Sequence, residues 1–318
     1  MHSRTWLTVT LVACLALVFA GTPALSQQKG PVIGLAIKSL TNPAYKACAD
    51  SAKATADKLG VELITLSSQG FSALEEQIHQ VEDLIQKRVN AIGIVAVDSK
   101  GVIPVIQEAN KANIPVLTVD TSADGGKLAT FIATDNLKAG RLAGEWMVQQ
   151  LEGKGKVAMI EGTPGSQQGR DRKTGFHEVI KAAPGINLVS SIPANFERAK
   201  GMEVMEDILT ANPDLAGVFA ANDEMALGAL EALKQRKLVG KVVLLGMNGA
   251  PEALKAVYAG DMQGTVVQYM EYVCETFVRS AVRAINGEKL PAYIDTGVSI
   301  ADTKFMKKIL GTLNVPLK

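Results

Sequence analysis

The 318-residue sequence has few cysteines, few aromatic residues and no excess of charge of either sign. Lys plus Arg number 33 against 32 Asp plus Glu, without any run of five like charges, which argues against nucleic-acid binding. Aromatic residues make up only 5% of a chain that is 47% hydrophobic, so aliphatic side chains must fill the core. This composition favours parallel strands covered by helices. A length of about twice the roughly 150 residues of a typical domain predicts two lobes.

The one long apolar run lies at the N-terminus and predicts an export signal. Residues 7–20 are almost wholly apolar, and Ala24 and Ser26 are the small residues that signal peptidase accepts. We expect residues 1–26 to be a cleaved signal peptide and the protein to be periplasmic. A lipoprotein signal ending at Cys14 is the alternative, although the apolar run continues past that cysteine. Spanning a bilayer takes roughly 20 apolar residues, and this run is shorter.

Loss of that segment leaves Cys48 and Cys274 as the remaining cysteines and brings the formal charge from +1 to zero. Two such distant cysteines form neither a disulfide-rich scaffold nor a zinc motif. They could bridge across the fold in an oxidising compartment, but we expect two separate buried thiols. No cofactor or metal is predicted.

Apolar strands alternate along the chain with amphipathic segments of helical length. In the first half, the pattern predicts strands at 32–37, 61–66, 91–95 and 116–119 and helices at 43–59, 74–89 and 102–110. Asn42 is placed to cap the first helix, with Pro43 at its first position and Gly60 at its end. The pattern restarts near Thr134 and continues to a last strand at 298–300. This order is typical of α/β lobes with doubly wound parallel sheets.

The strand order also predicts that the two lobes are interleaved in sequence. We expect an N-terminal lobe of residues 30–134 and 268–295 and a C-terminal lobe of residues 135–267 and 296–318. No low-complexity linker separates them. Short hinge crossovers should therefore join the lobes, with a ligand cleft between them.

Polar and aromatic side chains follow the predicted strands, where open α/β sheets bind ligands. Amide, carboxylate and guanidinium groups can form paired hydrogen bonds to neighbouring hydroxyls, and rings can cover the apolar face of a sugar. Singly, Asn42 and Asn222 could merely cap helices, and Phe196 could pack in the core. Their shared position predicts a sugar-binding cleft. The candidate residues are Lys38, Asn42, Tyr45, Asp120, Arg172, Phe196, Asn222, Asn248 and Gln268.

Motifs for catalysis are missing. His79 and His177, the histidines that remain after removal of the signal, lie in predicted helices with polar neighbours. The glycine-rich segment 162–169 lacks the Lys-Ser/Thr ending of a phosphate-binding loop, and no Gly-x-Ser-x-Gly motif occurs. The sequence therefore predicts a binding protein and not an enzyme.

Several stretches are similar to the ribose-binding-protein group of periplasmic sugar-binding proteins, in the same order over about residues 31–300. They are 38–45 (KSLTNPAY), 112–116 (ANIPV), 134–136 (TDN), 193–198 (PANFER) and 219–230 (FAANDEMALGAL). The resemblance implies a soluble receptor that closes two lobes on a monosaccharide and delivers it to a membrane ABC permease; some members also signal to chemoreceptors. It implies ligand contacts for most of the candidate residues, and Lys38 matches the lysine of allose-binding relatives.

Three positions depart from the family pattern. Ala44 stands where many members have a second aromatic residue, Thr121 where an arginine often follows the aspartate, and Asn248 where the family normally has aspartate. Asparagine donates as well as accepts hydrogen bonds and carries no charge. We therefore expect a hexose, a modified sugar or a polyol as readily as ribose. The primary hypothesis is a monomeric carrier for an ABC importer, and the alternative is a periplasmic sensor that reports to a chemoreceptor or a histidine kinase.

Overall fold

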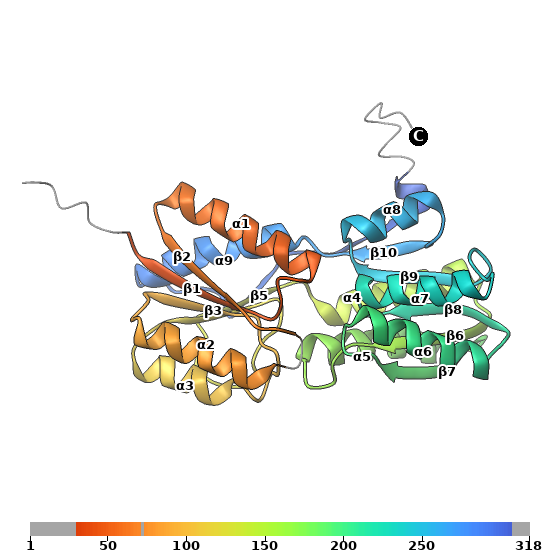
Figure 1. The fold of residues 1–318 in the computed structure, drawn as a ribbon, viewed down its shortest axis with the longest axis horizontal. Helices are drawn as coiled ribbons and strands as arrows, with labels where there is room; N and C mark the ends of the chain where they lie inside the picture. Colours follow the sequence, from red (N-terminus) through yellow and green to blue (C-terminus); the bar gives the residue numbers. More distant parts are fainter. Residues whose placement is uncertain (1–29, 71–72, 307–318) are drawn as a thin grey trace, which may run out of the picture. The chain divides into compact units, whose positions relative to one another are not determined.

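The computed structural model describes residues 30–70 and 73–306, which form two six-stranded sheets flanked by helices (Figure 1). The predicted signal peptide, including Cys14, lies outside the described residues. Within the described ranges, no helix has the length and apolar character needed to cross a membrane.

The first sheet is entirely parallel, with the strand order β11-β5-β4-β3-β1-β2. Apolar side chains of α1 and α9 pack on one face, and those of α2 and α3 on the other (Figure 1). The strands are β1 (Val32–Ile37), β2 (Glu62–Ser67), β3 (Ala91–Ile94), β4 (Val116–Val119), β5 (Thr130–Ala133) and β11 (Tyr293–Asp295), and the helices are α1 (Pro43–Leu59), α2 (Leu74–Gln86), α3 (Ile103–Lys111) and α9 (Met270–Ile285).

The second sheet has the order β12-β10-β9-β8-β6-β7 and is parallel except for the pairing of β12 with β10. Its strands are β6 (Gly155–Glu161), β7 (Ile186–Pro193), β8 (Leu215–Ala220), β9 (Val243–Asn248), β10 (Gly264–Val267) and β12 (Ser299–Asp302). Its helices are α4 (Asn136–Gln150), α5 (Gln167–Ala182), α6 (Arg198–Ala211), α7 (Asp223–Gln235) and α8 (Pro251–Ala259).

Helices α4 and α5 pack unusually closely, which fixes the position of the helix that carries Arg172. A Cβ atom on Gly140 would lie 2.3 Å from the Arg172 carbonyl oxygen, and one on Gly175 would lie 2.1 Å from the Leu137 carbonyl oxygen. Only glycine permits this approach of two backbones. The glycines thus place α5, and with it Arg172, against α4.

The predicted α/β fold class is confirmed, with some differences in detail. Helix α1 and strand β4 have the predicted bounds. Strands β5 and β11 were not predicted, and β12 runs antiparallel to its neighbour. The chain crosses between the sheets after β5, after β10 and after β11. The lobe boundaries given above stay a prediction.

The expectation of two separate thiols is wrong, because Cys48 and Cys274 form a disulfide. The two residues are 226 positions apart, on α1 and α9, with a Cα–Cα distance of 5.2 Å. Both are fully buried in the apolar layer between these helices, with Ala52 and Phe277. Cysteine spacing gave no signal of this bond, because the partners meet only when the chain returns to the first sheet and α9 packs on α1.

Candidate ligand-binding site

A small cavity of about 10 Å³ lies where strands of both sheets end. This volume is about that of one water molecule, so a larger ligand can enter only when the walls of the cavity move apart. Seven of the nine predicted residues line it; Lys38 and Gln268 instead form hydrogen bonds to residues that do. The lining consists of Asn42, Ala44, Tyr45, Asp120, Gln168, Arg172, Phe196, Asn222, Asn248 and Met270.

Asp120 follows β4 and forms the acidic part of the site. The Tyr45 hydroxyl donates to Asp120 Oδ2 over 2.8 Å, and the Thr121 hydroxyl lies 3.4 Å from the same oxygen. Burial, reinforced by the Asp120 carboxylate, raises the pKa of Tyr45 well above its usual value, so this hydroxyl remains a donor. The Asp120 carboxylate lines the cavity and can accept a hydrogen bond from a ligand hydroxyl.

Lys38 follows β1 and connects the first sheet to α5. Its Nζ donates to Thr121 Oγ1 at 2.8 Å and to Gln168 Oε1 at 3.2 Å, and the side chain is 1% exposed. Burial lowers the pKa of Lys38 to about 7; nearby Asp120 opposes this effect and Arg172 adds to it. Gln168 was not predicted as a site residue. Its role depends on a contact with residues far away in sequence.

The lowered pKa of Lys38 predicts a pH-dependent stability. Folding favours the neutral amine, because the pKa falls from 10.5 in the unfolded chain to about 7. Stability should therefore rise between pH 7 and 10, by at most about 1.4 kcal/mol per pH unit from this one group. Lys38→Met should lack that part of the rise. Melting temperatures of both proteins at pH 7 and pH 9 test this, and parallel pH profiles would contradict it.

Arg172 is fully buried in the centre of the site. Its Nε donates to Asn136 Oδ1 (2.9 Å), its Nη1 to the Ala221 carbonyl (2.6 Å) and its Nη2 to Gln268 Oε1 (2.9 Å). The guanidinium carbon lies 5.8 Å from the centroid of the Phe196 ring. Burial lowers the pKa of Arg172, but an arginine stays charged in proteins. These bonds use three of its five N–H donors and leave two for a ligand.

Asn42 and Asn222 both cap helices and line the cavity, so the capping role and the place in the site that the sequence suggested are compatible. Asn42 Oδ1 accepts from the Ala44 N–H at 2.9 Å at the start of α1. Asn222 Oδ1 accepts from the Met225 N–H at 2.8 Å at the start of α7, and its Nδ2 donates to the Phe196 carbonyl at 3.1 Å. Capping fixes each amide at the cavity wall.

Gln268 follows β10 and carries an unsatisfied donor. Its Oε1 accepts from Arg172 and, at 2.7 Å, from Asn248 Nδ2. Its Nε2 is buried and has no hydrogen-bond partner among the described residues. Buried donors are satisfied in the great majority of native structures. A ligand oxygen in the neighbouring cavity would supply the missing acceptor.

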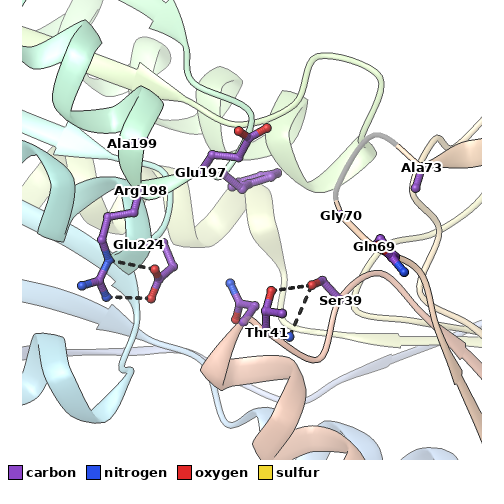
Figure 2. A pocket seen from close by; sticks show the side chains of 11 residues that line it. Ser39, Thr41, Gln69, Gly70, Ala73, Glu197, Arg198, Ala199 and Glu224 are labelled. Carbon is purple, nitrogen blue, oxygen red and sulfur yellow. Dashed lines mark hydrogen bonds and ion pairs between the residues drawn. The ribbon is translucent and has the colours of Figure 1, made fainter.

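A larger groove of about 690 Å³ adjoins the cavity through Asn42 and Phe196. Figure 2 shows Ser39 and Thr41 on one wall and Arg198 with Glu224 on the other. These polar side chains bond to one another: Ser39 to Thr41 at 2.7 Å, and Arg198 to Glu224 at 2.9 and 3.1 Å. These polar side chains of the groove are therefore less available to a ligand than those of the smaller cavity.

A family model described as a periplasmic binding protein domain matches residues 33–289. The chain belongs to the periplasmic binding protein family. It is 37% identical over 285 residues to the Ribose import binding protein RbsB of Escherichia coli (strain K12), covering 89% of this chain and 94% of that protein.

Solved structures of related binding proteins have the same fold as this chain. An ABC transporter periplasmic solute binding protein from Actinobacillus succinogenes 130z with bound D-allose has a TM-score of 0.83 and 33% identity, covering 87% of this chain and 99% of that one. An ABC transporter solute binding protein from Bacillus halodurans with bound myo-inositol has a TM-score of 0.83 and 28% identity, covering 90% and 99%.

This family membership confirms two predictions from the sequence. The chain is a periplasmic binding protein of the sugar-binding, ABC-transporter type, and it is a binding protein rather than an enzyme. The sensor alternative gains no support from these relatives.

Proposed function

We propose that this periplasmic binding protein carries a neutral monosaccharide or cyclic polyol to the permease of an ABC importer, as a monomer in the periplasm. The observation that carries the proposal is the small buried cavity lined by amide, carboxylate, guanidinium and aromatic side chains from both halves of the molecule. The disulfide supports the location, because disulfides persist in oxidising compartments.

The binding mechanism follows from the groups that remain available. The Asp120 carboxylate is an acceptor, while Arg172 and Gln268 Nε2 supply donors. A pair of neighbouring hydroxyls on one ring can donate to the first and accept from the others. The rings of Tyr45 and Phe196 would cover the apolar face of the same sugar.

Closure of the two lobes would couple ligand binding to transport. The proposed contacts come from both sheets: Tyr45 and Asp120 from the first, Arg172 and Asn222 from the second. A ligand gains all of them only when the lobes meet, so it stabilises the closed form over the open one. A permease could then distinguish loaded from empty protein by this difference.

The side chains that line the cavity and the names of the relatives support the ligand class. Asn248 contributes an amide that can both donate and accept. The relatives' names refer to ribose, D-allose and myo-inositol, which are neutral polyhydroxylated solutes. We propose the same class for this protein, with hexoses and cyclic polyols at least as suitable as ribose.

A thermal-shift screen of the protein without residues 1–26 tests this proposal. The panel holds pentoses, hexoses, inositols and nucleosides. A ligand at 100 times its Kd stabilises the folded state by about 2.7 kcal/mol, which gives a clear upward shift. Calorimetry on each hit should give one site per chain. Absence of a shift with every carbohydrate and polyol in the panel would contradict the proposed function.

A further inference from the structure

We infer that Asp223 and Thr265, which do not line the cavity, are positioning residues that hold the cavity-lining amides Asn222 and Asn248 in place. The inference rests on the proposed function, since it takes those amides to be ligand contacts. According to this inference, a buried polar network behind the cavity wall fixes the positions of the ligand contacts that come from the second sheet.

The network is compact and fully buried. Asp223 is 1% exposed and Thr265 is 0% exposed. Asp223 Oδ1 accepts from the Thr265 hydroxyl at 2.7 Å, and Asp223 Oδ2 accepts from the Ala250 N–H at 2.7 Å. Thr265 Oγ1 in turn accepts from the Gly249 N–H at 3.3 Å. One carboxylate thereby joins the start of α7, the turn after β9 and strand β10.

These attachments lie next to the cavity-lining amides in sequence. Asn222 immediately precedes Asp223, and Asn248 immediately precedes the bonded pair Gly249 and Ala250. Thr265 lies on β10, which leads directly into Gln268. The network can therefore set the distance between the two amides and the Gln268 side chain.

The turn that carries Asn248 needs such support because its backbone is strained. Asn248 has a φ of 143°, a conformation rare for residues other than glycine, and Gly249 follows with a φ of 77°. Asn248 Nδ2 must still reach Gln268 Oε1 at 2.7 Å. The bonds from Gly249 and Ala250 to the network hold the turn in this conformation.

A simpler role for Asp223, that of capping α7, does not account for its contacts. Asn222 already caps that helix through the Met225 N–H. Asp223 instead accepts from a different strand and a different turn. Strand β9 also packs closely against Asp223: a Cβ atom on Gly246 would lie 2.3 Å from Asp223 Oδ1.

Protonation offers a further readout of this role, measured as the difference between wild type and Asp223→Asn, because Lys38, with a pKa of about 7, also titrates next to the cavity. Burial raises the pKa of Asp223 to about 6, against the hydrogen bonds from Thr265, Ala250 and Gly249; neighbouring Glu224 raises it further. Arg172 is the cation of the site whose charge interacts with Asp223. A proton on Asp223 would displace one of its donors, so ligand affinity should fall as the pH drops from 7 to 5.

The decisive experiment compares Thr265→Val with Thr265→Ser. Valine keeps the shape and loses the hydroxyl, whereas serine keeps it. With the strongest hit among D-allose, D-ribose and myo-inositol, we expect about tenfold weaker binding for T265V, equivalent to one lost hydrogen bond, and nearly unchanged binding for T265S. Asp223→Asn should bind more weakly than wild type at pH 7 and should lose less affinity than wild type between pH 7 and 5. Equal affinities of folded T265V and wild type, or equal losses in T265V and T265S, would overturn the inference.

A ligand-free measurement separates this inference from the proposed function. In ¹⁵N NMR spectra of the empty protein, the side-chain amide signals of Asn222 and Asn248 should move in T265V and keep their positions in T265S. If they move although no tested sugar binds, the proposed function fails and the positioning role stands. If they stay in place in T265V, the positioning role is wrong whatever the protein binds.

Discussion

Replacing Arg172 by alanine is expected to weaken ligand binding at least about 100-fold, which is about 3 kcal/mol. The site would lose the two N–H donors that the guanidinium offers to the ligand. Its departure would also leave the acceptors Asn136 Oδ1 and Gln268 Oε1 with fewer donors in a buried site, and unsatisfied buried groups are costly. The first effect falls on the bound state alone, whereas the second also destabilises the empty protein.

Isothermal titration calorimetry with the strongest ligand from the screen measures this loss. Arg172→Lys keeps the charge but lacks the planar fork, so we expect it to recover only part of the affinity. Arg279→Ala is the matched control, because Arg279 lies on the exposed side of α9 in an ion pair with Glu275. Wild-type affinity in folded R172A would show that Arg172 does not contribute to ligand binding.

The second large effect is expected for the disulfide. Replacing Cys48 and Cys274 together by alanine should lower the free energy of unfolding by about 2–5 kcal/mol, with a melting temperature lower by roughly 5–15 °C. The closed loop is very long, and a crosslink over 226 positions removes much conformational freedom from the unfolded chain. The folded packing of α1 on α9 changes little.

Thermal melts with and without reductant check this prediction. Wild type should melt at a lower temperature once dithiothreitol has reduced the bond in the unfolded state, whereas C48A/C274A should be insensitive to the reductant. A double variant as stable as wild type would show that apolar packing between the two helices is sufficient.

The sequence predicted those elements whose signals are local. Helix α1 has the expected bounds because Asn42, Pro43 and Gly60 mark its start and end by their own backbone preferences. The fold class followed from repetition of such signals. Strands β5 and β11 have four and three residues and acquire their strand conformation from pairing with neighbours in the sheet, so they left no pattern to detect.

The candidate site likewise contains residues that local sequence signals predict and residues that only long-range contacts reveal. Residues that directly follow strands, such as Asp120 and Asn222, could be predicted because the edge of the sheet brings them together. Gln168 could not, since it enters the site through Lys38, 130 positions away. The network of Asp223 and Thr265 was also missed, because its members face the interior beneath the cavity and only their contacts distinguish them from ordinary polar residues.

The return of the chain to the first sheet has a consequence for the order of synthesis. Helix α9 and strand β11 belong to that sheet, yet they emerge only after every strand of the second sheet except β12. Cys48 must therefore remain a thiol while more than two hundred residues are made. The half of the molecule that begins the chain is thus completed only after most of the other half, and formation of the disulfide shows that α9 has docked on α1.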